Sequence, residues 1–273
     1  MRRQLLRASL LTAVLALGAS STVVAADESR IRVLHASPDA PAVDVYLDGA
    51  IVTGLTNVPF GVISGYLTVP AGDHEIKVTP TGDTTAVIEA TVTLEAGRSY
   101  TIAAIGPVAS IGPKVIVDDP QPAAGSAKVR VVHLSPDAPA VDVAPDGAEP
   151  GGAVVTNLAY PDATDYLALP PGSYDLEVRP TGTTDVALDL DPLNLESGRA
   201  YSVFAIGSAA SEPLGGNALR ALVAVDAVAA PATDTVSDGP AQMPSPLVFG
   251  ALLALAAAVA VAFVRRLVAV RAR

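Results

Sequence analysis

The segment HASPDAPAVDV occupies residues 35–45, and HLSPDAPAVDV occupies residues 133–143. The two segments differ at one position, which is Ala36 in the first and Leu134 in the second. These segments begin 98 residues apart, and further landmarks recur in the same order at offsets of 100 or 101 residues: Tyr66 with Tyr166, Pro70 with Pro170, Gly72 with Gly172, Pro80-Thr81-Gly82 with Pro180-Thr181-Gly182, and Gly97-Arg98 with Gly198-Arg199. The units of a solenoid usually span about 20 to 50 residues, so this longer period indicates two whole domains.

Each copy shows the residue alternation expected of β-strands. Between Val43 and Gly49 the odd positions are apolar up to Leu47, and the even positions are mostly charged. A period of two with one apolar face is typical of a half-buried strand. Turn residues such as Pro70-Ala71-Gly72-Asp73 separate these runs about every 8 to 12 residues. The sequence therefore predicts an all-β chain with two tandem immunoglobulin-like or fibronectin-like β-sandwich domains, each of about seven or eight strands.

The composition along the chain divides it further. We expect a first repeat at 27–118, a linker at 119–126, a second repeat at 127–230 and a Pro-rich stalk at 231–246. The two prolines of the linker favour a semi-rigid spacer, which predicts that the two copies are held apart. The second copy has Ala144-Pro145 where the first has Tyr46-Leu47. Since proline lacks an N–H donor, we expect that strand to be shorter or to lie at a sheet edge.

The two ends of the chain carry export and membrane signals. Residues 1–26 combine an arginine-containing start, an apolar stretch and a small-residue site, a pattern typical of a signal peptide. The pair Arg2-Arg3 leaves twin-arginine export open beside the general route. Residues 247–264 are uncharged, and the tail at 265–273 contains four arginines. This predicts a single transmembrane helix with a cytoplasmic C-terminus, and so a cell-membrane protein with its repeats outside the cytoplasm.

Charge and residue usage limit the function classes. All 28 acidic residues lie between the two apolar ends, together with 10 of the 17 basic residues. Nucleic acid is not an expected partner, because phosphate contacts need clustered Lys and Arg. The chain has no cysteine, so it has no disulfide, thiol nucleophile or zinc–cysteine site. Calcium stays open, although Asp44 and Asp48 lie about 13 Å apart along one strand, too far for one ion.

The repeated segment contains the residues most suggestive of chemistry. These are His35, Ser37 and Asp39, with His133, Ser135 and Asp137 in the second copy. A hydrolase triad usually brings its members from separate elements around a pocket, and these residues are close neighbours in sequence. We therefore predict that they brace a turn by bonding local backbone groups. No catalytic, cofactor-binding or metal-binding residue is predicted. The alternative is a sensor or enzyme with a ligand pocket at this segment.

A second structural signal is the spacing between a leucine and a tyrosine. Leu94 precedes Tyr100 by six residues across a Gly-Arg turn, and Leu195 precedes Tyr201 in the same way. In many β-sandwiches such a tyrosine forms a tyrosine corner, with its hydroxyl bonded to nearby backbone. The alternative is an ordinary half-buried strand tyrosine.

The repeated segment, the following Asp-Gly and the later AGRSY (96–100) or SGRAY (197–201) turn together resemble a bacterial surface domain family, domain of unknown function 4397. The resemblance covers about residues 29–230. It implies an extracytoplasmic module that usually occurs in tandem on exported or anchored bacterial proteins, and it brings no catalytic residues or cofactor. The prediction is a membrane-anchored protein whose two noncatalytic modules act as a spacer or bind a surface protein or glycan.

Overall fold

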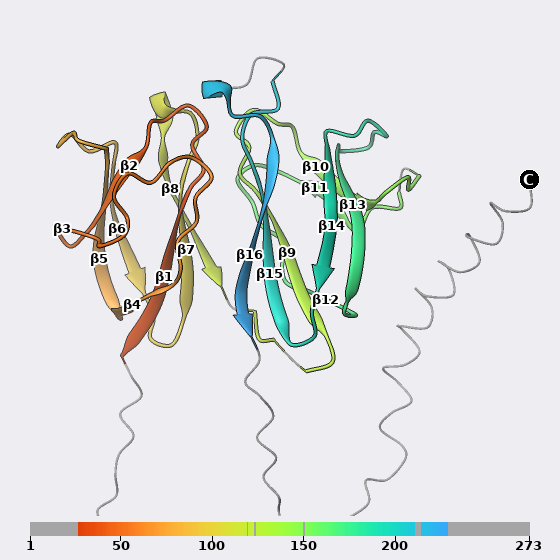
Figure 1. Cartoon of the computed structure of the whole chain (residues 1–273), viewed down its shortest axis with the longest axis horizontal. Coiled ribbons are helices and arrows are strands. Elements are labelled where there is room, and N and C mark those ends of the chain that lie inside the picture. Colours follow the sequence, from red (N-terminus) through yellow and green to blue (C-terminus); the bar gives the residue numbers. More distant parts are fainter. Residues whose placement is uncertain (1–26, 119, 123, 150, 211–213, 229–273) are drawn as a thin grey trace, which may run out of the picture. The chain divides into compact units, whose positions relative to one another are not determined.

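The computed structural model describes residues 27–118, 120–122, 124–149, 151–210 and 214–228. Within these residues the regular structure consists of β-strands and two short 3₁₀ helices (Figure 1). No helix in the described part of the chain is long and apolar enough to cross a bilayer. The predicted signal peptide, stalk, transmembrane helix and basic tail all lie outside the described residues.

The two repeats have the same order of strands. The described part of the first repeat contains β1 (Glu28–His35), β2 (Val43–Leu47), β3 (Ala50–Ile51), β4 (Leu67–Pro70), β5 (Gly72–Pro80), β6 (Ile88–Leu94), β7 (Ser99–Ile105), η1 (Val108–Ser110) and β8 (Gly112–Asp118). That of the second contains β9 (Ala127–His133), β10 (Val141–Pro145), β11 (Val155–Leu158), β12 (Leu167–Leu169), β13 (Gly172–Pro180), β14 (Leu188–Leu195), β15 (Arg199–Ile206), η2 (Leu214–Gly216) and β16 (Arg220–Val228).

Each repeat is a sandwich of two four-stranded sheets. The sheets of the first repeat have the orders β4-β1-β7-β8 and β3-β2-β5-β6, and those of the second have the orders β12-β9-β15-β16 and β11-β10-β13-β14. The first strand of each repeat pairs in parallel with the seventh, β1 with β7 and β9 with β15. The alternating apolar side chains of both sheets meet in a core, which in the first repeat includes Ile31, Val45, Ile76 and Ile102. The all-β fold with two tandem domains is therefore as predicted.

Two local features follow from the turn residues. The chain leaves β4 at Pro70 and enters β5 at Gly72, so this turn moves it from one sheet of the sandwich to the other. Gly72 has a φ of 133°, a backbone conformation that residues with a Cβ rarely adopt.

The expectation for Pro145 is wrong. Strand β10 has five residues, as β2 has, and it lies between β11 and β13 inside its sheet. Pro145 is the last residue of the strand, so its missing N–H interrupts no further ladder bond there.

The expectation that the linker holds the copies apart is also wrong. All seven residues of β7 are buried, and so are the last seven of β15, although one face of each strand covers its own sandwich core. The other face enters a cluster to which both repeats contribute, here called the shared cluster: Leu34, Ala36, Ala103, Ile105, Ile116, Val132, Leu134, Phe204 and Ile206. Two apolar sheet faces cannot both remain in water at low free energy, so they pack on each other.

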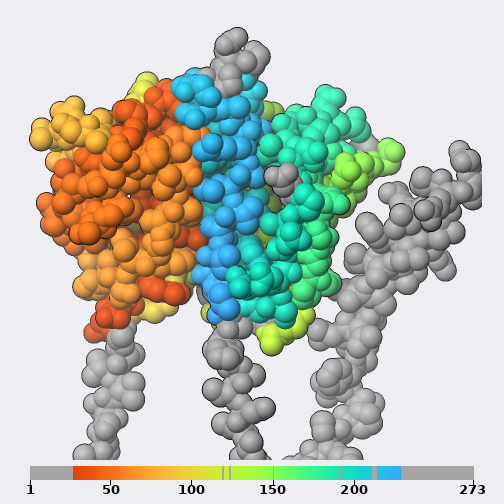
Figure 2. Space-filling model, in the orientation of Figure 1, coloured from red at the N-terminus to blue at the C-terminus, as the bar shows by residue number. Residues whose placement is uncertain are grey.

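The sheets that contain β1 and β9 are called the inner sheets, because they face each other across the shared cluster. Figure 1 shows the four sheets in the order outer, inner, inner, outer. In Figure 2 the blue band that includes β16 lies directly against the orange atoms of the first repeat, in agreement with a contact between Arg220 and Phe60.

Candidate functional site: the repeated segment and the face between the repeats

His35 and His133 end the first strand of their repeats and are fully buried. Each Nε2 donates to a carbonyl oxygen six residues later, at 3.0 Å to Pro41 and 3.1 Å to Pro139. Burial lowers the pKa of both imidazoles, and the hydrogen bond to the carbonyl only partly opposes this. Both rings are therefore neutral braces for the turn that follows, at a depth that solvent does not reach.

The other ring nitrogen differs between the copies. Nδ1 of His133 accepts the backbone N–H of Ser135 at 3.3 Å. Nδ1 of His35 is buried with no hydrogen-bond partner among the described residues. Ser37 donates its hydroxyl to the carbonyl of Gly106 at 2.6 Å instead of to an imidazole. No serine–histidine hydrogen bond of the kind that activates a nucleophile joins these side chains in the first repeat.

The aspartates of the repeated segment tie the turn to the loop after the seventh strand. Asp39 accepts the backbone N–H of Val108 at 2.7 Å. Asp137 accepts the Ser208 hydroxyl and the backbone N–H groups of Ala209 and Ala210. These bonds join residues about 70 positions apart, so the segment positions a distant loop as well as its own turn.

The tyrosines at the predicted corners have the same contact in both repeats. The hydroxyl of Tyr100 accepts the backbone N–H of Glu95 at 2.9 Å, and that of Tyr201 accepts the N–H of Glu196 at 3.0 Å. Both rings are buried in the cores of their sandwiches.

Asp44 and Asp142 have a role that the sequence analysis missed. Each carboxylate accepts the N–H of an asparagine with positive φ at 2.7 Å, Asn57 in the first repeat and Asn157 in the second. Each also accepts a threonine hydroxyl and a glycine N–H from the Pro-Thr-Gly turn. The backbone bonds lower the pKa of both carboxyl groups. The recurrence of the Pro-Thr-Gly turn in both copies was the signal in the sequence that could have indicated this role of the aspartates.

Asp48 is bonded in another loop. Its carboxylate accepts from Nδ1 of His74 at 2.7 Å and from the N–H of Glu75 at 2.9 Å. This hydrogen bond raises the pKa of His74 and lowers that of Asp48. The described residues contain no group of three His, Asp or Glu side chains arranged to hold a metal ion.

The face between the repeats contains a buried ionic network. Arg32 donates to Asp226 of the second repeat at 2.5 Å, and Arg130 donates to Asp118 of the first. All four residues are at most 4 % exposed. Burial by itself would lower the pKa of Arg32, but the charges of Asp226 and Asp118 outweigh it and raise the pKa.

Neutral donors complete this network with twofold symmetry. Asp118 accepts from Tyr66 and Thr101, both at 2.7 Å, and Asp226 accepts from Tyr166 and Ser202, both at 2.6 Å. Burial, and then the nearby carboxylate, raises the pKa of each of these tyrosines. The arrangement matches an isologous dimer interface within one chain, because equivalent residues make equivalent contacts across it.

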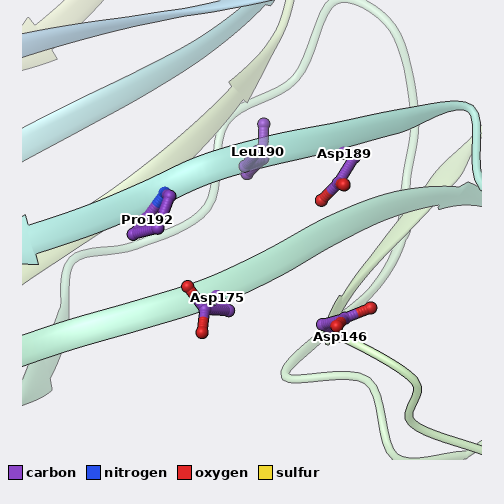
Figure 3. Close-up of a pocket in the computed structure, with 5 residues that line it drawn as sticks. All are labelled: Asp146, Asp175, Asp189, Leu190 and Pro192. Carbon is purple, nitrogen blue, oxygen red and sulfur yellow. The ribbon is translucent and has the colours of Figure 1, made fainter.

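A hollow on the outer sheet of the second repeat is lined by three aspartates. It has a volume of about 230 Å³ and is lined by Asp146, Asp175, Asp189, Leu190 and Pro192. Figure 3 shows the three carboxylates around an open space between neighbouring strands and a loop. Neither His35 nor Asp39 lines it, so the repeated segment forms no wall of this hollow.

The sequence model of a family described as "Domain of unknown function (DUF4397)" matches residues 29–144 and 148–237. The chain belongs to this family. The two matched segments meet inside the second repeat, after β10 begins, and not at the linker where the sheets change. Among curated proteins, none matches this chain.

Several solved structures are similar to parts of this DUF4397 chain. The Bacillus anthracis TIE protein is 11% identical over 67% of this chain, which spans about a third (34%) of that protein, with a TM-score of 0.22. A family CBM26 module of Eubacterium rectale Amy13K, solved with maltoheptaose, is 10% identical over 75% of this chain and 98% of its own, with a TM-score of 0.24. A putative cell adhesion protein of Parabacteroides distasonis is 12% identical over 73% of this chain and 98% of its own, with a TM-score of 0.19. At such TM-scores these proteins do not inform the function of this chain.

Proposed function

We propose that this protein is a membrane-anchored extracytoplasmic module whose two repeats, of immunoglobulin-like architecture, act together as a noncatalytic spacer and protein-interaction unit. The observation that carries the proposal is the buried face between the repeats. It joins two sandwiches into one body with outer sheets directed to opposite sides, which suits a structural or binding role at a surface. The anchoring part rests on the apolar segment at 247–264 and the arginines after it.

The surroundings of the histidines support a noncatalytic role. A general base must reach the proton that it removes, and both imidazoles are fully buried with Nε2 held by a carbonyl. The rival function, a sensor or enzyme with a pocket at His35 and Asp39, needs an imidazole that a ligand can reach, and the His35 side chain is fully buried.

A protein partner is favoured over a glycan by the use of the aromatic residues. The chain has no tryptophan, and five of its seven tyrosines have their hydroxyls bonded within a sandwich or at the face between the repeats. Few aromatic rings remain for stacking on sugar rings.

The test combines topology with partner capture. Protease added to intact cells stripped of their wall should remove both repeats and leave a membrane-bound stub with a protected C-terminal tag. Crosslinking of intact cells should then attach the repeats to proteins in a repeatable pattern, unchanged when the hollow is altered by Asp189→Ala. Full protection of the repeats would contradict the topology, and a turnover activity lost on His35→Gln in a folded protein would contradict the noncatalytic role.

A further inference from the structure

The polar and apolar parts of the face between the repeats differ in symmetry. The polar part is symmetric, since each repeat supplies one arginine and one aspartate to the other. The apolar part is not symmetric. The strand registers place Ala103 beside Leu34 in the first repeat and Phe204 beside Val132 in the second, so Ala103 and Phe204 occupy equivalent positions.

A second position shows the same difference in size. Within the eleven-residue repeated segment the copies differ only at Ala36 and Leu134, and these are the residues of that segment that belong to the shared cluster. All four side chains are fully buried. The first repeat therefore presents two small residues where the second presents two large ones.

Phe204 extends to the side of the first repeat. Its ring centroid lies 5.7 Å from the guanidinium carbon of Arg32. Protein interiors are close-packed, so a large side chain on one face needs a small one on the other. Pairing two first-repeat faces would leave voids at both alanines, and pairing two second-repeat faces would crowd two phenylalanines together.

We propose that the inner-sheet face of each repeat is a heterotypic docking surface that accepts the opposite repeat and rejects its own kind, and that a second copy of this chain can supply that opposite repeat. The ionic and apolar contacts that define the face come from β1, Ala36, β7 and β8 on one side and from β9, Leu134, β15 and β16 on the other. Complementarity of this kind does not depend on whether one chain or two chains supply the strands. The proposal does not depend on the anchoring or on the partner in the proposed function.

The first test exchanges the sizes within one full-length chain, purified in a mild detergent. Ala103→Phe and Phe204→Ala should each raise the unfolding equilibrium constant, the latter by roughly 100-fold or more. The double variant should recover a clear part of that loss, because the large residue again faces a small one. A loss in the double variant equal to the product of the two single effects would overturn the size matching.

The second test distinguishes pairing of the two repeats within one chain (cis) from pairing between two chains (trans). A full-length Phe204→Asp chain has a blocked second face and a free first face, and an Ala103→Asp chain has the reverse. Sedimentation should show a one-to-one complex in the mixture, bound at least about tenfold more tightly than either chain binds itself.

Controls keep this result decisive. Each variant is checked for β-sheet content by circular dichroism, since each sandwich has a core separate from the shared cluster. Self-association of either variant as strong as that of the mixture, or folded variants that do not associate at all, would overturn the trans docking. If a charged variant unfolds, Ala103→Leu and Phe204→Ala chains replace the two charged chains. The same two outcomes would then overturn the trans docking.

Discussion

Removal of the Asp226 carboxylate should destabilise both repeats at once. This group accepts three hydrogen bonds at the face between the repeats: from Arg32 of the first repeat at 2.5 Å, and from Tyr166 and Ser202 of its own repeat at 2.6 Å each. Asp226→Ala leaves a guanidinium that is 2 % exposed without its closest counter-charge, and two hydroxyls without their acceptor.

The size of this loss in stability follows from the burial of the ion pair between Arg32 and Asp226. Breaking a buried ion pair by removing one partner costs about 3 to 5 kcal/mol, because the remaining charge is buried and uncompensated. Asp118 lies 3.7 Å from Nε of Arg32 and compensates part of that charge, so we expect the lower half of the range. For a structure of about 200 residues this corresponds to a fall of about 6 to 16 °C in Tm.

The assay is thermal unfolding of the protein, followed by circular dichroism, with two comparisons. Asp118→Ala should cost about as much, since the network has twofold symmetry. Asp189→Ala, an exposed aspartate on the outer sheet, should change the free energy of unfolding by less than about 0.5 kcal/mol. A Tm for Asp226→Ala within the error of the Asp189→Ala control would refute the ionic network as a source of stability.

The remaining predictions concern tyrosines and histidines. Tyr100→Phe and Tyr201→Phe should each lower the free energy of unfolding by about 1 to 3 kcal/mol, because a backbone N–H loses its acceptor; unchanged melting would remove the tyrosine-corner interpretation. In NMR titrations His74 should titrate above its ordinary pKa of 6.5, so it stabilises the fold below pH 6.5 and loses this contribution as the pH rises through its raised pKa. His35 and His133 should titrate below 6.5, so their contribution is present above pH 6.5 and is lost as the pH falls; titration of all three at one pH would contradict this. His35→Ala and His133→Ala should each cost about 2 to 4 kcal/mol in unfolding measurements, and a fully stable variant would contradict the bracing role.

The strand pattern and the repeat could be predicted from the sequence because both are local. Alternation between Val43 and Leu47 identifies a half-buried strand whatever it packs against. The face between the repeats is not local, since Arg32 and its partner Asp226 are 194 positions apart. Charged residues on a strand are usually solvated, so Arg32 on its own indicates an exposed face.

One signal of that face was present in the sequence. The segment SYTIAAI at 99–105 has apolar or small residues at odd and even positions alike, and such a continuous run is typical of a strand buried on both sides. The run indicates that something covers the second side, without indicating what does so. The two prolines of the linker favour separation of the repeats, so the sequence does not identify the second repeat as the cover.

The length of the linker decides which partner each face meets first. Asp118 ends β8 and Ala127 begins β9, so eight residues separate the paired repeats. A short tether gives the second repeat an effective concentration near the first in the millimolar range. Pairing within one chain therefore dominates in dilute solution, and pairing between chains requires a blocked cis face or a comparable local density. If the repeats are anchored on one membrane, neighbouring chains are confined to a thin layer, where exchange between chains competes best with pairing inside each chain.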